Sequence, residues 1–285
     1  MRAQQTIWSI AAGFIVLAFF AALFRQQSPS SSDASTAAVV SGAERDRLVG
    51  EMQAALALDW RVRREPTQRL VEAVAVYAEH PDLNTAETDF ALGLVRYYGR
   101  GDVDGAESAF RRALNRAPEW PWPWDKLGVL LYTAGDRSGG IGALEKAMAL
   151  DPDWSRPHSD LAILYRLDGD LEGAMTEVLK ALALEPDNPL TRYNYAVVLD
   201  YSGYLLEARD QYYRVLELDD SLPAPYYNLA CGYAKEGNTE KALDYLAAAI
   251  DRDRAFHLEA LSDPDFDAVR DTPAFFEFMI RRSPK

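Results

Sequence analysis

Cysteine, histidine and clustered carboxylates are the residues of this sequence that could do chemistry. The single cysteine, Cys231, excludes an intramolecular disulfide and a thiolate metal cluster. The histidines, His80, His158 and His257, lack the spacing that a zinc site on one helix face requires, and no histidine signature for nucleophilic catalysis accompanies Cys231. We therefore predict a protein that is not an enzyme, with no catalytic residue, no metal and no cofactor.

Acidic residues gather at positions 217–220 and again at Asp263, Asp265 and Asp267. A hard cation or a basic partner could use them, but solvated faces and helix N-terminal charges are the preferred explanation. The formal net charge is -14. Because affinity for nucleic acid comes mostly from clustered lysine and arginine, no nucleic-acid partner is expected.

An apolar stretch near the N-terminus is the first structural element that the sequence indicates. Residues 7–24 carry no charge, and at about 1.5 Å per residue a helix of this length approaches the thickness of a thin bilayer. A cleaved signal peptide is the alternative, although its apolar region is usually shorter. We predict a transmembrane anchor at 7–24, after a short tail at 1–6.

The orientation of this anchor is poorly determined by charge, since Arg2 on one side competes with Arg25 on the other. A very short N-terminal tail is the usual form of an uncleaved signal anchor. We therefore expect a single-pass membrane protein whose folded part lies outside the cytoplasm, on the periplasmic side. Residues 25–42 are rich in serine and alanine and predict a flexible linker.

A 34-residue period runs between residues 121 and 254. Apolar residues recur at helical spacing in each half of the period, which predicts pairs of amphipathic helices. A glycine separates the halves and can cap the first helix in a left-handed conformation, and Asp136, Asp170 and Asn238 are expected N-caps of the second. The positions that repeat include Leu127, Leu161, Tyr195 and Leu229, and the glycines Gly135, Gly169, Gly203 and Gly237.

This pattern resembles the tetratricopeptide repeat (TPR) family, whose signature places W-x2-L-G-x2-Y, a glycine, two alanines and a proline at set offsets. One unit carries Trp124, Leu127, Gly128, Ala147 and Pro152, and a unit starting near residue 86 fits with one extra residue in its inter-helix turn. The resemblance implies an all-α fold, a right-handed α-solenoid of helical hairpins with five units at 86–254. A degenerate leading hairpin is expected at 43–85 and a capping segment at 255–285, with Phe266, Val269, Phe275, Phe276 and Met279 available to cover the last repeat.

In this family the first helix of each hairpin lines a concave groove that binds protein partners. Units that start at Pro121, Ser155, Pro189 and Pro223 give the register. Aromatic and arginine side chains in such a groove suit an extended peptide or a partner helix, although the same aromatics could simply pack between hairpins. The partner-binding residues that the register implies are Trp122, Asp125, Tyr132, Arg156, Arg166, Tyr193, Asp200, Tyr201, Tyr227 and Lys235.

The expected function is that of a membrane-tethered scaffold or adaptor, which binds protein or peptide partners to assemble a membrane-associated complex. Two alternatives stay open. Open solenoid ends can support self-association into a lattice, and an enzyme accessory role would use the repeats only as a frame.

Overall fold

The computed structural model describes residues 85–282, and these residues form helices without a strand among them. The prediction of an all-α helical repeat is confirmed. The predicted anchor at 7–24, the linker at 25–42 and nearly all of the leading hairpin at 43–85 lie outside the described residues. Between residues 85 and 282, no helix combines the length and apolar character needed to cross a membrane.

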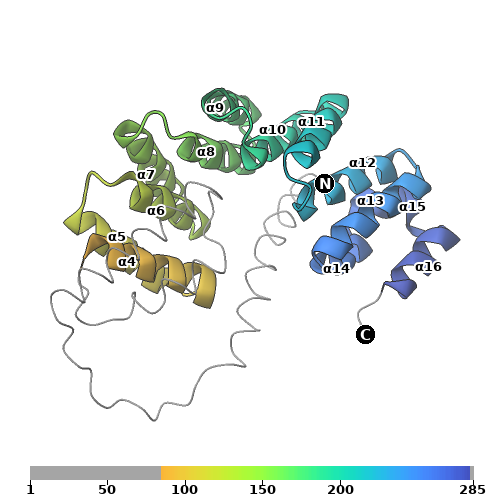
Figure 1. Ribbon diagram of the computed structural model, residues 1–285, viewed down its shortest axis with the longest axis horizontal. Helices are drawn as coiled ribbons and strands as arrows, with labels where there is room; N and C mark the ends of the chain where they lie inside the picture. Colours follow the sequence, from red (N-terminus) through yellow and green to blue (C-terminus); the bar gives the residue numbers. More distant parts are fainter. Residues whose placement is uncertain (1–84, 283–285) are drawn as a thin grey trace, which may run out of the picture. The chain divides into compact units, whose positions relative to one another are not determined.

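Two units make up the described part, one at residues 85–153 and one at 154–282. The first contains the pairs α4 with η1 and α5, and α6 with α7. The second contains the pairs α8 with α9, α10 with α11, and α12 with α13, followed by a C-terminal segment (Figure 1). The elements of the first unit are α4 (Ala86–Leu94), η1 (Val95–Gly99), α5 (Val103–Arg116), α6 (Pro121–Thr133) and α7 (Arg137–Leu150). Those of the second are α8 (Ser155–Asp168), α9 (Leu171–Leu184), α10 (Pro189–Tyr201), α11 (Leu205–Leu218), α12 (Pro223–Lys235), α13 (Thr239–Arg252), α14 (Ala255–Ser262), η2 (Pro264–Phe266), α15 (Asp267–Arg270) and α16 (Pro273–Arg281).

Local sequence explains where these helices begin and end. α6, α10 and α12 start on a proline, whose fixed φ and missing N–H suit the first helical position. The glycine between the helices of each of the last four hairpins has a positive φ, from +73° to +102°, which residues other than glycine rarely adopt. Asp136, Asp170 and Asn238 each accept a backbone N–H of the following helix, so these predicted N-caps are confirmed.

The first hairpin accommodates its extra residue in a way the sequence did not indicate. The residue lies inside the first helix, where Val95–Gly99 forms a π-helical turn, and not in the turn between the helices. Gly101 has a φ of +64° and Asp102 caps α5, as Asp136, Asp170 and Asn238 do for the second helices of three later hairpins. A π turn absorbs one inserted residue without changing the helix ends, so the hairpin keeps its turn intact.

The unit at 85–153 has a core of leucine and phenylalanine from α4, α5 and α6, including Phe90 and Phe110. In the second hairpin, α6 and α7 approach at Gly128 and Gly140. A Cβ on Gly128 would lie 2.9 Å from the Gly140 carbonyl oxygen, and one on Gly140 would lie 2.7 Å from the Gly128 oxygen. Because such contacts are too short for a real Cβ, these two positions require glycine.

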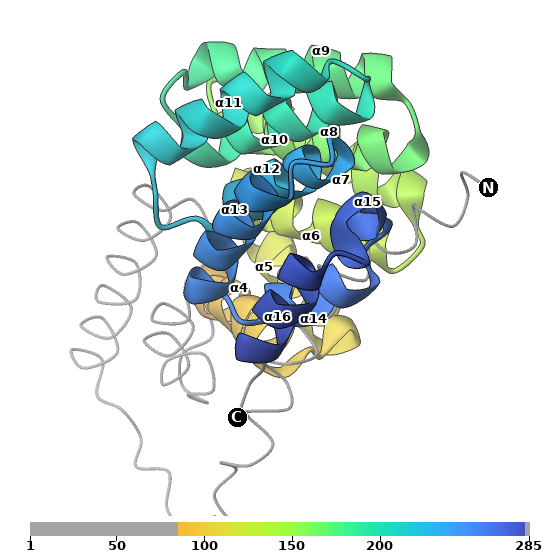
Figure 2. The same cartoon turned by 90° about the vertical axis from the view of Figure 1, so that its right-hand side faces the viewer.

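In the unit at 154–282, first and second helices form two layers. Figures 1 and 2 both show α8 and α10 on one side and α9 and α11 on the other. The layers share apolar side chains such as Ala196, Leu199 and Tyr212. The hairpins α8–α9 and α10–α11 therefore turn their first helices toward a common face.

The C-terminal segment packs on the last hairpin. Phe266, Val269, Phe275 and Met279 are buried in one core with residues of α12 and α13, as the capping prediction anticipated for these side chains. Phe276 differs, because its side chain is 65% exposed. It lies one residue beyond Phe275 on α16, so the helix turns it away from the core.

Candidate partner-binding face

The first helices of the unit at 154–282 present a row of polar side chains, which we call the first-helix face. Each hairpin contributes residues from the same positions in the repeat, near the start and near the end of its first helix. The face consists of Ser159 and Arg166 from α8, Tyr193, Asn194, Asp200 and Tyr201 from α10, and Tyr227, Asn228 and Lys235 from α12.

Near the helix starts, side chains of consecutive hairpins are joined by hydrogen bonds at a constant separation. The Asn194 amide nitrogen donates to the Ser159 hydroxyl at 2.8 Å, across 35 residues. One repeat later, the Asn228 amide nitrogen donates to the Tyr193 hydroxyl at 3.2 Å, again across 35 residues. The same relation therefore recurs from α8 to α10 and from α10 to α12, and we call it the hydrogen-bond row.

Asn228 also reaches the second layer. Its amide nitrogen donates to the Tyr212 hydroxyl of α11 at 3.0 Å, and the rings of Tyr193 and Tyr212 lie 6.0 Å apart. Burial raises the pKa of Tyr193 to about 12, so both tyrosines remain neutral at physiological pH. The amide of Asn228 thus fixes two tyrosine rings at once.

Near the helix ends, a second relation links charged and aromatic groups. The Arg166 guanidinium lies over the Tyr201 ring, 4.7 Å from its centroid, which is the range of a cation–π interaction. The Lys235 ammonium pairs with Asp265 of η2 at 2.8 Å. Arg166, Asp200 and Lys235 thus place a positive, a negative and a positive group along the face, one from each first helix.

The charges at this end of the face act on one another. Burial raises the pKa of Asp200, Asp265 adds to the increase, and Lys235 opposes it. For Lys235, burial disfavours the charged form, but the hydrogen bond and charge of Asp265 outweigh it and the pKa is raised. Lys235 is therefore a stable cation between two carboxylates.

The C-terminal segment continues the hydrogen-bond row at its last position. The Tyr227 hydroxyl donates to Asp263 Oδ2 at 2.8 Å, across 36 residues, and the Tyr227 ring stacks on Phe256 of α14 with 4.6 Å between centroids. The Cys231 thiol also faces Asp263 Oδ2, at 3.7 Å. Asp263 thus occupies the place that an asparagine of a further hairpin would fill.

The C-terminal segment places several carboxyl groups close to Tyr227 and Cys231. Burial raises the pKa of Glu259 on α14 to about 7, and Asp263 and Asp253 add to the increase. Burial also raises the pKa of the Cys231 thiol well above its usual range, and Asp263 and Asp265 contribute. A thiol held in this protonated form is a poor nucleophile and a poor metal ligand.

Cys231, Asp263 and Asp265 have ligand atoms within 4.8 Å of one another. Among the described residues, they form the group of three His, Cys, Asp or Glu side chains that lie close enough together to hold a metal ion. Each carboxylate already has a partner, Tyr227 for Asp263 and Lys235 for Asp265. The arrangement therefore serves to attach the C-terminal segment to α12.

The ten residues expected in the groove divide by exposure. Tyr201 and Lys235 are exposed, and Arg166, Asp200 and Tyr193 are partly buried on the first-helix face. Arg156 pairs with Asp160 on its own helix at 2.9 Å. Three of the ten are buried: Asp125, Tyr132 and Tyr227. Asp125 and Tyr132 belong to the unit at 85–153, and Tyr227 lies in the first-helix face under Phe256 and Asp263, so none of the three contacts a partner in the proposal.

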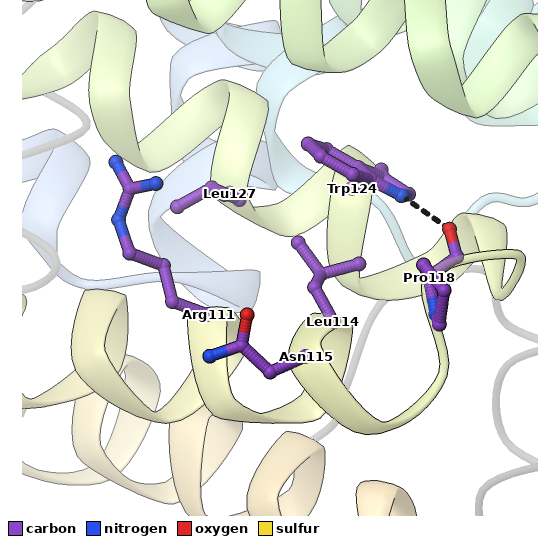
Figure 3. A pocket seen from close by; sticks show the side chains of 6 residues that line it. All are labelled: Arg111, Leu114, Asn115, Pro118, Trp124 and Leu127. Carbon is purple, nitrogen blue, oxygen red and sulfur yellow. Dashed lines mark hydrogen bonds between the residues drawn. The ribbon is translucent and has the colours of Figure 1, made fainter.

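Trp122 belongs to the unit at 85–153, where it packs on the core beside Phe90, with 6.4 Å between ring centroids. A hollow of about 320 Å³ lies nearby, between α5 and α6 (Figure 3). The Trp124 indole nitrogen donates to the Pro118 carbonyl at 2.9 Å at its edge. The lining residues are Arg111, Leu114, Asn115, Pro118, Trp124 and Leu127, which offer no grouping of acid, base and nucleophile.

Several residues of this face were not among the expected ones. Asn194 and Asn228 follow the predicted groove position by one residue, so they could have been found by asking which residues recur beside it. Beside the face, Asp263 and Asp265 were expected only as members of an acidic cluster, and Glu259 was not expected. These residues carry no repeat signal, because they lie beyond the last regular unit.

Comparisons with known proteins agree with this architecture. Residues 224–256 match a family model described as tetratricopeptide repeat. The chain is similar to a thermophilic TPR protein of Thermus thermophilus, TTC0263, with 22% identity and a TM-score of 0.56 over 61% of this chain and 96% of that one. It is also similar to PilW, described as a widely conserved type IV pilus biogenesis factor, with 17% identity and a TM-score of 0.59 over 69% of this chain and 91% of that one.

A third similar structure is pilF of Pseudomonas aeruginosa, with 17% identity and a TM-score of 0.52 over 83% of this chain and 99% of that one. At these identities the structural likeness shows the fold. No curated protein sequence matches the chain. The repeated hairpins, the family match at residues 224–256 and the structural neighbours together show a helical repeat fold of the tetratricopeptide type.

Proposed function

We propose that this protein is a membrane-tethered scaffold that holds a protein partner on the first-helix face. Tetratricopeptide repeats generally mediate protein–protein interactions, and their stacked hairpins present extended binding surfaces. The membrane tether is supported by the uncharged residues 7–24. No catalytic role is proposed, because the polar groups of the face bind one another and form no nucleophile–base pair.

The observation that carries the proposal is the constant relation between consecutive first helices. The hydrogen-bond row fixes the side chains near the helix starts before any partner arrives. Affinity gains when a surface is ordered in advance, because less conformational entropy is lost on binding. Beside this row lie the groups available to a partner, which are Arg166, Asp200, Tyr201 and Lys235.

A site-specific crosslink tests this proposal. A photo-crosslinking amino acid replaces Lys235 on the face, and in a matched control it replaces Lys180, an exposed lysine of α9 in the other layer. We expect a discrete crosslinked partner from position 235 in intact membranes and none from position 180. Adding Asp200→Lys, which reverses the charge beside the crosslinker, should abolish the product. Equal products from both positions, or a product insensitive to D200K, would exclude this face as the binding surface.

The tether and its orientation need a separate measurement. A C-terminal fusion to a reporter that is active only in the cytoplasm should stay inactive if the repeats lie on the periplasmic side. Membrane fractionation should leave the protein in the pellet after a salt wash and release it in detergent. A bright reporter would overturn the orientation, and release by salt alone would overturn the anchor.

Self-association is a second candidate function, and one surface favours it. Four large apolar side chains on α14 and α16 are exposed: Leu258, Leu261, Phe276 and Ile280. His257 of α14 contacts the backbone of Met279 on α16 at 2.9 Å, so these helices are neighbours. Exposed apolar groups at the end of a repeat array can pair with a second copy.

A further inference from the structure

The turn between α10 and α11 departs from the other inter-helix turns of the described array. Its N-cap position holds Tyr204, whereas the other four hairpins have Asp102, Asp136, Asp170 and Asn238 there. Those four side chains each accept a backbone N–H, and Tyr204 makes no such bond. The two residues that follow are leucines, Leu205 and Leu206.

These side chains are directed into solvent. Tyr204, Leu205 and Leu206 are between 55% and 63% exposed, and we call them the turn patch. At the position of Leu206 the other hairpins carry polar residues, namely Asp104, Ser138, Glu172 and Glu240. Loss of a good N-cap costs about 1 kcal/mol, and exposed leucines add no stability. Folding therefore does not account for the turn patch, whereas contact with another molecule does.

The turn patch has an acidic border. Arg166 at the end of α8 contacts Tyr201, and Arg209 near the start of α11 pairs with Glu236 at the end of α12 at 2.9 Å. These contacts place the neighbouring turns on either side of the patch. The turns supply exposed carboxylates from three successive hairpins, which outnumber the nearby cations Arg166, Arg209 and Lys241. These carboxylates are Asp168, Asp170, Glu172, Glu207, Glu236 and Glu240.

We propose that the turn patch is a second docking surface, separate from the proposed first-helix binding role, and that it receives an amphipathic helix of a partner protein. The apolar stripe of that helix covers Tyr204, Leu205 and Leu206. Lysine or arginine residues beside the stripe face the acidic border, where opposite charges steer and orient the complex. A surface of anionic lipid fits poorly, because the border repels its headgroups. A second copy fits poorly as well, since it would bring the same acidic border against this one.

The repeat itself supplies a variant that should fold. Y204N/L205T/L206E gives this turn the residues Asn238, Thr239 and Glu240 of the next hairpin, and it restores an N-cap that the fold already uses there. We expect the variant to resist urea at least as well as the parent. Loss of binding then cannot be attributed to unfolding. The matched control is Leu179→Thr, which removes an exposed leucine on α9.

The binding test uses the full chain in phosphatidylcholine nanodiscs and two fluorescent peptides, an amphipathic helix of leucine and lysine and its leucine and glutamate counterpart. Empty nanodiscs give the lipid background. The lysine peptide should bind the parent and L179T with equal affinity. Its affinity for the triple variant should be lower by about tenfold or more. Its affinity for the parent should fall as the salt concentration rises. The glutamate peptide should bind weakly to all three.

Equal affinity of the lysine peptide for the parent and the triple variant would overturn the proposal, as would preference for the glutamate peptide. Sedimentation of the same proteins adds one more decisive outcome. If the triple variant dissociates an oligomer that the parent forms, the patch is a contact between copies and the proposal fails. The first-helix residues Asp200 and Lys235 are intact in every variant. The outcome of this peptide-binding test is therefore independent of the outcome of the crosslinking test at Lys235.

Discussion

Asn228 joins the two helical layers through one amide group. Its nitrogen donates to the hydroxyls of Tyr193 on α10 and Tyr212 on α11. Asn228→Ala should leave both hydroxyls without this donor, and an unsatisfied buried polar group costs about 1–3 kcal/mol. Urea denaturation should therefore show a lower free energy of unfolding for N228A. Asn115→Ala, at an exposed position of α5, is the control, and an equal loss in both variants would contradict the assignment.

Glu259 gives the fold a pH dependence that can be isolated. Its pKa is about 7 in the folded chain, against 4.5 for an ordinary glutamate. Between these values the folded state keeps a proton that the unfolded state has released, so stability falls as pH rises through this window. Below pH 4.5 Glu259 is protonated in both states and does not change the free energy of unfolding. Above pH 7 it is ionised in both states, and the full loss of stability is present.

Glu259→Gln removes this titration. The variant should gain stability over the parent as pH rises from 4.5 to 7.5, by an amount on the order of 1–3 kcal/mol. Urea midpoints at pH 5 and pH 8 measure the difference, and Glu240→Gln, at an exposed position in α13, controls for the loss of one negative charge. A gain in E259Q that is the same at both pH values would contradict the raised pKa.

Among the elements, the C-terminal segment acts as a cover for α12. Phe266 of η2 is fully buried between Tyr227 and Phe275, and Asp263 faces Cys231. Phe266→Ala removes the central ring, at a cost of about 3–5 kcal/mol for a buried phenylalanine. The segment should then open locally more often and expose Cys231.

The single cysteine makes this opening measurable with a thiol reagent, since every modified molecule is modified at Cys231. We expect labelling of F266A under native conditions to be faster by about tenfold or more, while circular dichroism retains most of its helical signal. Phe276→Ala, which removes an exposed ring of α16, should label at the parent rate. A labelling rate for F266A equal to that of the parent would show that the segment does not control access.

The regular elements were predictable because each is specified locally. The glycine turns, the N-caps Asp136, Asp170 and Asn238, and the helices starting at Pro121 and Pro223 all follow from residues a few positions apart. The extra residue of the first hairpin was expected in the inter-helix turn, but it lies in the π turn at Val95–Gly99. One extra residue fits either a helix or a loop, and the spacing alone does not distinguish them. The turn patch was missed although its signal, a tyrosine at an N-cap position, is visible in the sequence.

The binding residues were less predictable than the helices that hold them. A family register states which side chains point to a face, but it does not state what covers that face. Tyr227 has the register position of Tyr193, yet Phe256 and Asp263 of the C-terminal segment bury it. This contact joins residues that the repeat period does not relate, so it emerges only from the folded chain.

At the scale of the whole molecule, the exposed side chains of α14 and α16 predict self-association. If they form a contact between copies, Phe276→Ser with Ile280→Ser should convert an oligomer of the full chain to a monomer in sedimentation velocity. The same double change should leave the urea midpoint nearly constant, because both side chains are exposed in the single chain. A parent protein that is monomeric at high concentration would remove this candidate function.

The hydrogen-bond row also governs how this array can lengthen by gene duplication. Each bond joins a residue in one hairpin to the residue that follows its counterpart in the next, 35 positions later. A copy of the 34-residue unit α10–α11 inserted between α11 and α12 therefore meets suitable neighbours on both sides. A unit inserted after α13 keeps the C-terminal segment attached only if it carries counterparts of Tyr227 and Cys231, because these are the residues of α12 that contact Asp263. A copy of α12–α13 meets this requirement and a copy of α8–α9, with Ser159 and Ile163 at these positions, does not. The last hairpin and the C-terminal segment are therefore a single heritable module.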